Sequence, residues 1–408
     1  MAHKSALQTL LPGMNKNIAL LMASLAFGQA VMVALIATAT LAAQYITNDN
    51  ASAFYPTTLQ FVGMLVFTTP VAYMMKWLGR RWGLTLGALV GICSALLSVY
   101  AIFSANFVLL CIGGFFFSIQ SVVVNQIRFA AVEAAEPGQQ ANAVSYVLIG
   151  GIAAALMGPQ LGTWSVDLFE PIMFAGTYAV LACLVTVSMI LVQFTDIKKP
   201  EEKATDGPSR SLWQLLTIPR FFVAMMAAAL GYGTMNFMML PTPIAMQLCG
   251  YSSEAGGWVI TGHVLGMFAP SLVTGRLINR FGVEKIVAVG GALLTISAII
   301  ALSGLSYGHF MIGLIILGVG WNFAFIGGTT MLASVYKPQE RAKAQSLNDF
   351  CVFSLVALSA LTTGQVLDAS GWSTVVTIVI PAGLIVFTLV VLLIAFGNKP
   401  VGPQAGTA

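Results

Sequence analysis

One segment of the sequence carries polar side chains at helical spacing inside an otherwise apolar stretch. Ser118, Ser121, Asn125 and Arg128 follow one another at intervals of three, four and three residues, so they share one face of an α-helix. A charged group within an apolar helix is costly and usually faces protein or a water-filled cavity. This face predicts a surface that binds a polar ligand. The alternative is that Arg128 reaches the membrane interface.

Strongly polar side chains also occur singly in other apolar stretches. Indole rings and amides of this kind could stack on and hydrogen-bond an organic molecule, although each amide could equally join two helices. The predicted substrate cavity comprises Gln29, Asn125, Arg128, Asn236, His263, Trp321 and Asn322.

Two titratable side chains are candidates for carrying a proton. Asp349 and Arg128 each lie nine to eleven residues from a proline in a polar segment, so we expect them at similar depths in different helices, where they could form a salt bridge. Pairing of Asp349 with Lys343 or Arg341 is the alternative. His263 is the second candidate because an ordinary histidine pKa of about 6.5 suits a switch; a neutral imidazole that joins two helices is the alternative.

The elements that must position these residues are membrane-spanning helices. The chain has 408 residues, of which 58% are apolar and 8% charged, and its mean hydropathy is +0.89. A soluble protein carries about a quarter of its residues as charged groups. Soluble, disordered, collagen-like and nucleic-acid-binding classes are therefore excluded. The five cysteines have no CxxC spacing and lie mostly in apolar runs, which predicts buried thiols, no metal site and no cofactor.

Twelve apolar stretches are long enough to cross about 30 Å of hydrocarbon as helices. They cover residues 17–46, 55–78, 82–103, 106–134, 140–165, 170–194, 219–247, 254–278, 283–304, 308–335, 340–367 and 372–397. A polar break divides them into six and six. We expect an N-terminal six-helix bundle over 1–194, a linker over 195–217, a C-terminal bundle over 218–397 and a tail over 398–408.

The basic residues predict the orientation of these helices. Seventeen of the eighteen Lys and Arg residues fall at the termini, in the linker, or in every second loop; Arg128 is the exception. The positive-inside rule therefore predicts that both termini and the linker are cytoplasmic. We expect a multi-pass protein of the bacterial inner membrane.

The two halves contain an internal repeat. The segment around Gly79-Arg80-Arg81 aligns with the segment around Arg280 and Gly282 at an offset of 203, and residues 137–145 align with 338–346 at an offset of 201. Parallel six-helix repeats around a central substrate site are a transporter architecture.

These motifs resemble those of the major facilitator superfamily, which implies an all-α fold of twelve membrane helices in two six-helix repeats. Gly275, Asn279, Arg280 and Gly282 keep most of the family's loop motif, whereas the first copy keeps Gly79, Arg80 and Arg81 and has Lys76 near the place of the expected acid. The resemblance therefore implies a conformational latch at the second copy and makes one doubtful at the first. It also implies that helices 4 and 11 meet at the inner gate, where protonation of Asp349 would couple proton movement to gating.

Gly158, Pro159 and Gly162 resemble the glycine–proline motif of proton-coupled exporters, although the same residues could serve packing alone. We therefore expect a monomeric secondary transporter that exports a small organic solute at the expense of the proton gradient. A proton symporter that imports a small anionic nutrient, with Arg128 as the anion's partner, is the alternative. A receptor or an enzyme is disfavoured, because no HExxH or GxSxG motif accompanies the buried polar residues, no Walker-type GxxxxGK[ST] sequence occurs, and no output domain is evident.

Overall fold

The computed structural model describes residues 14–49, 52–136, 140–197 and 209–396, and the regular elements within these ranges are helices. Apolar chain segments become helices in a membrane because lipid offers no partner for the backbone N–H and C=O groups. Eleven described segments are long and apolar enough to cross a membrane, and the last of them is divided at Gly371, where φ is 74°. The expected all-α architecture with twelve apolar helical segments is confirmed.

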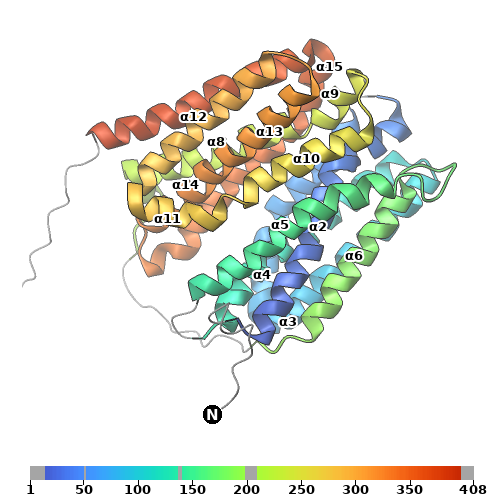
Figure 1. The fold of residues 1–408 in the computed structure, drawn as a ribbon. Coiled ribbons are helices and arrows are strands. Elements are labelled where there is room, and N and C mark those ends of the chain that lie inside the picture. The colour runs from blue at the N-terminus through green and yellow to red at the C-terminus, as the bar shows by residue number, and fades with distance from the viewer. Residues whose placement is uncertain (1–13, 50–51, 137–139, 198–208, 397–408) are drawn as a thin grey trace, which may run out of the picture.

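The first half of the chain forms one bundle of helices (Figure 1). Its elements are α2 (Lys16–Thr47), the 3-10 turn η1 (Ser52–Phe54), α3 (Tyr55–Phe103), α4 (Phe107–Ala134), α5 (Gln140–Trp164) and α6 (Ala175–Gln193). The helix α3 contains two of the expected spans, which are separated at Gly79 by a non-helical backbone with φ of 79°.

The second half forms a bundle beside the first. Its elements are α7 (Leu212–Leu216), α8 (Pro219–Met239), α9 (Thr242–Leu248), α10 (Ser253–Phe268), α11 (Ser271–Phe281), α12 (Val283–Leu302), α13 (Tyr307–Trp321), the π-helical turn η2 (Asn322–Ile326), α14 (Gly327–Ala333), the 3-10 turn η3 (Pro338–Glu340) and α15 (Arg341–Phe396).

Three spans that the hydropathy pattern predicts as continuous are interrupted in the structure. The span expected over 219–247 breaks between α8 and α9 at Pro241, and the one over 254–278 breaks between α10 and α11 at Pro270. Proline supplies no N–H to the helix and crowds the preceding turn. The span over 308–335 contains the π turn η2. All three interruptions lie in the second bundle.

One end of the molecule gathers the described basic residues that flank the helices, and we call it the basic end. There, the Asn15 amide donates to the Ala134 carbonyl at 2.9 Å and the Asn17 amide to the Asp196 carbonyl at 2.7 Å, so the start of α2 meets the ends of α4 and α6. The opposite end, which we call the neutral end, carries η1 and the α9–α10 connection. Residues 1–13 and 397–408 at the termini and residues 198–208 of the linker lie outside the described residues.

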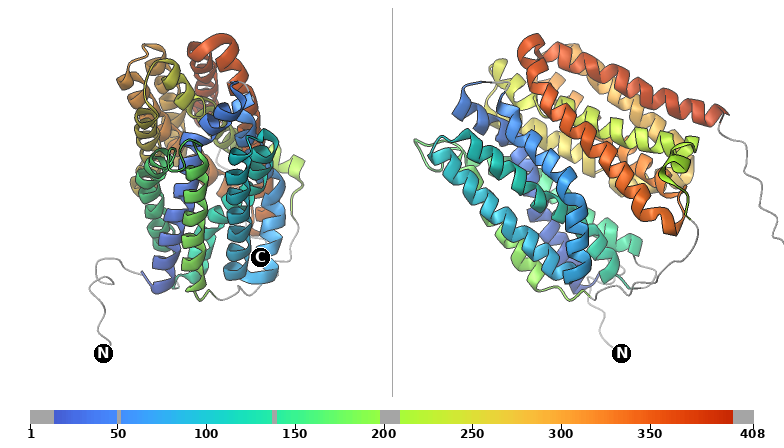
Figure 2. Two further views of the ribbon diagram at one scale, coloured as in Figure 1. Left: turned by 90° about the vertical axis from the view of Figure 1, so that its right-hand side faces the viewer. Right: turned by 180° about the vertical axis from the view of Figure 1, so that it is seen from behind.

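The two bundles touch each other towards the neutral end. Phe54 of η1 fills the space beside Gly364 of α15, and the Gln160 amide of α5 donates to the Thr261 hydroxyl of α10 at 3.3 Å. In Figure 2 the ribbons of the two bundles meet at this end and diverge towards the end where α2 begins. These contacts therefore close the neutral end, and the exposed side chain of Arg128 on α4 indicates that the space between the bundles opens towards the basic end.

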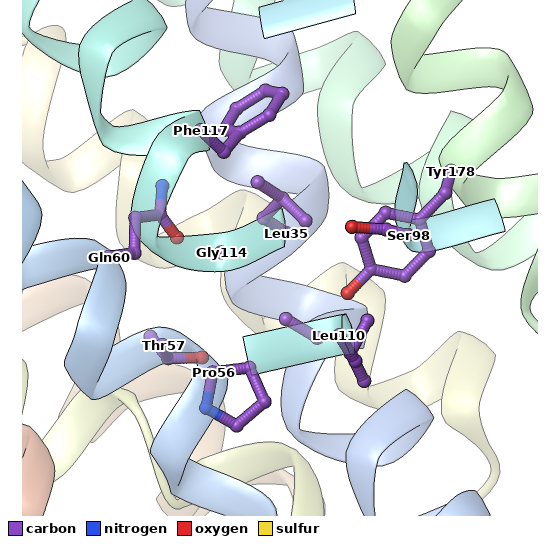
Figure 3. A pocket seen from close by; sticks show the side chains of 10 residues that line it. Leu35, Pro56, Thr57, Gln60, Ser98, Leu110, Gly114, Phe117 and Tyr178 are labelled. Atoms are coloured by element: carbon purple, nitrogen blue, oxygen red, sulfur yellow. The ribbon is translucent and has the colours of Figure 1, made fainter. Parts of the chain in front are cut away.

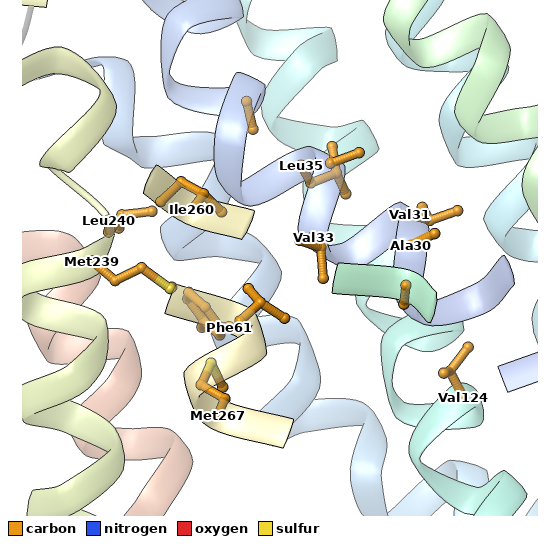
Figure 4. Close-up of a cluster of buried hydrophobic side chains, with 14 of the residues drawn as sticks. Ala30, Val31, Val33, Leu35, Phe61, Val124, Met239, Leu240, Ile260 and Met267 are labelled. Carbon is orange, nitrogen blue, oxygen red and sulfur yellow. The ribbon is translucent and has the colours of Figure 1, made fainter. Parts of the chain in front are cut away.

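A continuous apolar core seals the contact between the bundles. In Figure 4, Val33 and Phe61 of the first bundle lie near Met239, Ile260 and Met267 of the second, and all five side chains belong to one buried cluster. Burying these side chains stabilises the closed neutral end and excludes water from it.

Candidate substrate-binding site

Five aromatic side chains from the second bundle form a cluster that we call the aromatic recess. Its members are Tyr232 of α8, Phe268 of α10, Trp321 of α13, Phe325 of η2 and Phe353 of α15. The Trp321 and Phe325 rings stack with centroids 5.1 Å apart and planes 14° apart, and Tyr232 meets them edge-on at 5.4 and 5.2 Å. Offset stacking and edge contacts are the favoured aromatic geometries.

The π turn positions this recess. It begins directly after Trp321, so the near-parallel stack of Trp321 and Phe325 spans the irregular backbone. Turns of this kind occur frequently at functional sites. Trp321 is buried, whereas Tyr232, Phe325 and Phe353 are half-buried. The recess therefore leaves part of its aromatic surface open to a ligand.

Arg128 lies within the apolar membrane-spanning part of α4, yet its side chain is exposed and within electrostatic range of Asp349 and Tyr232 of the second bundle. This combination is what a water-filled space between the bundles produces. Its Nε donates to the Asn125 carbonyl at 3.2 Å, and its guanidinium lies 5.4 Å from the Phe129 ring centroid. Within the described part of the chain it has no carboxylate partner within 4.0 Å.

Asp349 of α15 faces the same space from the second bundle. It is half-buried, and one carboxylate oxygen accepts from the Asn348 amide at 3.2 Å. Asp349 and Tyr232 are both within electrostatic range of the Arg128 guanidinium. Asp349 and Phe353 are four residues apart on one helix, which places them on one face. The Arg128 guanidinium, the Asp349 carboxylate and the aromatic recess therefore lie around one space.

The alternative partner of Asp349 is occupied elsewhere. The Lys343 Nζ donates to the Ser209 hydroxyl at 2.9 Å and to the Arg210 carbonyl. The side chain of Arg341 lies outside the described residues. The Arg128–Asp349 salt bridge expected when the inner gate shuts stays a prediction, since the structure has that end open.

Asn322 is fully buried, and its amide is used within the protein. Its Oδ1 accepts from the Thr274 hydroxyl at 2.7 Å, and its Nδ2 donates to the Met267 carbonyl and the Ser271 hydroxyl, both at 2.6 Å. These bonds tie the π turn to the break between α10 and α11. The geometry favours a structural role, in which Asn322 supports the recess without touching a ligand.

Asn236 and His263 are also buried and join helices. Asn236 Nδ2 donates to the Ser359 hydroxyl at 2.9 Å, and His263 Nδ1 lies 2.7 Å from the Leu314 carbonyl. Each keeps one buried atom, Asn236 Oδ1 and His263 Nε2, without a hydrogen-bond partner among the described residues. Gln29 and Asn125 are half-buried.

The glycine–proline motif of α5 packs this helix against α2. A side chain at Gly158 would meet the Ala30 carbonyl at 2.7 Å, and one at Gly162 would meet Ala34 at 3.2 Å. Pro159 lies within the same helix, near Gly257 of α10. Small residues of this kind let backbones approach closely, so the motif packs α5 tightly against α2.

The repeat is visible in the backbone at the basic end. Gly79 and Gly282, which the sequence aligns at an offset of 203, have φ of 79° and 91° and each separates two successive helices. Such angles lie in a region that favours glycine. The two loops therefore have the same turn, although their side chains differ.

The side chains of the two copies are used differently from expectation. Arg80 in the first copy pairs with Glu133, with Nε at 2.9 Å and Nη2 at 2.6 Å from the carboxylate oxygens, and its Nη1 donates to Gln126. Arg280 is exposed and stacks on Phe281 at 5.2 Å, with no ion pair among the described residues.

The other residues of these motifs lie at the surface. Arg81 is exposed, and its Nε lies 3.4 Å from the Gln193 amide oxygen. Asn279 is exposed, and a side chain at Gly275 would meet nothing within 4 Å. Sequence reasoning missed the Arg80–Glu133 pair because the two residues are 53 positions apart.

A small cavity lies inside the first bundle, between Leu35, Pro56, Thr57, Gln60 and Tyr178 (Figure 3). Gln60 donates to the Ser121 hydroxyl at 3.1 Å, while the Thr57 hydroxyl is buried without a described partner. The cavity has room for about one water molecule, which is too little for an organic solute. The space beside the aromatic recess is therefore the candidate substrate site.

Metal and thiol chemistry find no support in the described residues. No group of three or more His, Cys, Asp and Glu side chains there could hold a metal ion. The cysteines were expected to be buried, but Cys93 and Cys183 are exposed on helix surfaces and Cys249 is exposed directly after α9.

The fold and the site define an integral membrane transporter, and comparison with known proteins agrees. The family model of the Major Facilitator Superfamily matches residues 18–256 and 221–407. The chain belongs to this superfamily and is a multi-pass membrane transporter of small solutes, not an enzyme.

Particular relatives cover almost the whole chain. The chain is 39% identical to the riboflavin transporter RfnT of Brucella anthropi over 393 residues, which are 96% of this chain and 98% of that protein. It is 27% identical over 362 residues to YdeG of Bacillus subtilis, an uncharacterised transporter of the same superfamily, covering 85% and 84% of the two chains.

Solved structures share the fold at low sequence identity. A variant of the nucleoside transporter NupG aligns with a TM-score of 0.71 at 14% identity, covering 92% of this chain and all of that one. A bacterial homologue of the iron transporter ferroportin, in an outward-facing state, aligns with a TM-score of 0.66 at 13% identity, covering 94% and 100%.

Proposed function

We propose that this protein is a proton-coupled transporter of riboflavin or a closely related flavin. The observation that carries the proposal is the 39% identity to a riboflavin transporter over nearly the full length of both chains. The comparison covers 96% of this chain and 98% of that protein, so a shared solute class is the simplest interpretation.

The candidate site supports a flat aromatic solute. The isoalloxazine ring of riboflavin is a planar heterocycle with a polar edge, and the aromatic recess offers the partly open rings of Tyr232, Phe325 and Phe353 for stacking. Arg128, without a carboxylate partner among the described residues, offers hydrogen-bond donors beside them.

The distribution of charge supports the orientation of the protein. The basic end of the bundles would face the cytoplasm of a bacterial cell by the positive-inside rule. The structure, which is open at that end, would then be the inward-facing state of a monomeric inner-membrane transporter. Asp349, half-buried and facing the open space, is the proposed proton carrier, with His263 as the second candidate.

Export is the proposed direction, and its support is the resemblance of the α5 motif at Gly158 and Pro159 to that of proton-coupled exporters. The second candidate function is proton-driven import of a small anionic nutrient. Arg128 favours this candidate, because a cation open to solvent and free of a described carboxylate can bind a carboxylate or a phosphate.

Flux into proteoliposomes tests the solute and the coupling together. Purified protein of known orientation is reconstituted, riboflavin fluorescence is followed, and a pH gradient of either sign is imposed. We expect flux that a protonophore abolishes and that the Asp349→Asn variant loses while retaining exchange. Asp368→Asn, which changes an exposed carboxylate of the same helix just before the break at Gly371, is the matched control.

Growth of a riboflavin auxotroph decides the direction. Expression should raise the external riboflavin needed for growth if the protein exports, and should lower it if the protein imports. Absence of riboflavin flux under every gradient, in a preparation that stays folded, would remove riboflavin as the solute. Topology is tested by cysteines placed at Asn50 and Ser253, which should label from outside.

A further inference from the structure

The volume beside the aromatic recess has a cation on one side and an anion on the other, and the two belong to different bundles. Arg128 of α4 and Asp349 of α15 are within electrostatic range of each other. No ion pair within 4.0 Å joins them in the described part of the chain. Both groups are therefore available to a third group that lies between them.

The two formal charges cancel, and this restricts the ligand. An anionic ligand would be attracted by Arg128 but repelled by the Asp349 carboxylate, and a cationic ligand would be attracted by Asp349 but repelled by Arg128. Repulsion between like charges at close quarters opposes binding in both cases. A guanidinium only donates hydrogen bonds, whereas an ionised carboxylate only accepts them. A neutral edge that carries both acceptors and a donor satisfies both.

A cyclic imide has such an edge, because its atoms follow the order C=O, N–H, C=O in one plane. The carbonyl oxygens can accept from a guanidinium, and the N–H can donate to a carboxylate. Conjugation makes the ring flat, so it can stack on aromatic side chains. Asp349 and Phe353 share one helical face, which sets a carboxylate beside a half-buried ring.

We propose that Arg128 and Asp349 together bind the imide edge of a planar heterocycle whose ring stacks in the aromatic recess. The inference rests on the proposed function and deepens it, since riboflavin has this edge on the pyrimidine ring of its isoalloxazine. The ligand class is flavins and pteridine-diones. Recognition depends on the ring edge, and the ribityl chain contributes little.

Calorimetric titration of the full chain in lipid nanodiscs tests this assignment. The probes are riboflavin, lumiflavin, lumazine, ribitol and the 3-methyl derivatives of the three heterocycles, in which a methyl group replaces the imide hydrogen. We expect lumiflavin to bind about as tightly as riboflavin and ribitol not to bind. Methylation should weaken binding by about 10- to 100-fold, the loss of one hydrogen bond to a charged group.

The variant Asp349→Ala tests whether the Asp349 carboxylate recognises the imide edge of the ligand. It should bind riboflavin and 3-methylriboflavin with nearly equal affinity, whereas Asp368→Ala, the matched carboxylate outside the site, should keep the wild-type ratio. The ratio of the affinities for riboflavin and 3-methylriboflavin compares two ligands on one protein, so a general loss of stability does not alter it. The same ratio is also measured on the wild-type protein, where no substitution is needed.

The outcomes separate this inference from the proposed function. Equal affinities for riboflavin and 3-methylriboflavin in the wild type overturn the imide assignment while flavin transport stands. Methyl-sensitive binding of lumazine without any binding of riboflavin supports the assignment and removes riboflavin as the solute. If none of the three heterocycles binds, the imide assignment is wrong.

Discussion

Replacing Gly364 by alanine should hold the neutral end of the transporter open. Phe54, which is 1% exposed, occupies the space beside Gly364, and a Cβ added there would overlap the Phe54 ring. The contact joins the first bundle to the second, so the overlap exists only when the neutral end is closed. Opening that end relieves it.

The size of the effect follows from this overlap. Inserting a methyl group into a well-packed core costs about 1–3 kcal/mol. If this cost falls on the closed state alone, the ratio of open to closed molecules rises about 5- to 150-fold. Riboflavin flux should fall, because transport requires both states.

A single cysteine at Gln160 measures the change. This residue lies in the contact between the bundles and donates to Thr261 at 3.3 Å, so an impermeant maleimide reaches it only when the neutral end opens. In a background without the five native cysteines, Gly364→Ala should label at least about 5-fold faster, in proportion to the open population. Gly308→Ala is the control, since Gly308 is exposed and a side chain there would meet only the Ser306 hydroxyl, at 3.7 Å.

A second substitution guards against a trivial explanation. Phe54→Ala removes the overlapping ring, so the double variant should label more slowly than Gly364→Ala alone. Unchanged labelling of a folded Gly364→Ala protein would refute the reasoning, because it would mean that Phe54 moves aside without cost or that this contact does not close the neutral end.

Three further comparisons of variants have definite expected outcomes. Arg80→Gln should lower the free energy of unfolding by about 1–2 kcal/mol, because it breaks a bidentate, partly buried ion pair. Arg280→Gln, at an exposed residue, should change the free energy of unfolding by less than about 0.5 kcal/mol. Thermal unfolding in detergent compares the two variants, and equal losses of stability would contradict the structure. Asn322→Leu should lower the free energy of unfolding by about 1–3 kcal/mol, because it removes buried hydrogen bonds. The folded variant should keep its affinity for riboflavin. A loss of affinity at normal stability would instead show that Asn322 touches the solute. Arg210 lowers the pKa of Glu340 from its usual value. The stabilisation from this pair should therefore be complete above the ordinary glutamate pKa of about 4.3 and should disappear only as the pH falls below that value. The melting temperatures of the wild type and Glu340→Gln should differ at neutral pH and converge in acid, and a difference that does not change with pH would refute the assignment.

The hydropathy pattern alone was sufficient to predict the helices. Lipid offers the backbone no hydrogen-bond partners, so apolar stretches of sufficient length have to be helical whatever packs against them. The repeat was also predictable, because Gly79 and Gly282 mark turns whose φ favours glycine. The interruptions at Pro241 and Pro270 carried a local signal in the prolines themselves, and hydropathy averaged over a whole span concealed it.

Only the tertiary structure decided what each polar and aromatic side chain does. Arg128 and Asn322 both stand out in the sequence as polar groups in apolar helices, yet one is open to solvent and the other is consumed by three hydrogen bonds to neighbouring segments. Tyr232 and Phe353 of the aromatic recess do not stand out, because aromatic residues are ordinary in membrane helices. A side chain's role depends on which helices lie beside it, and that depends on contacts between residues far apart in the chain, which hydropathy and spacing do not encode.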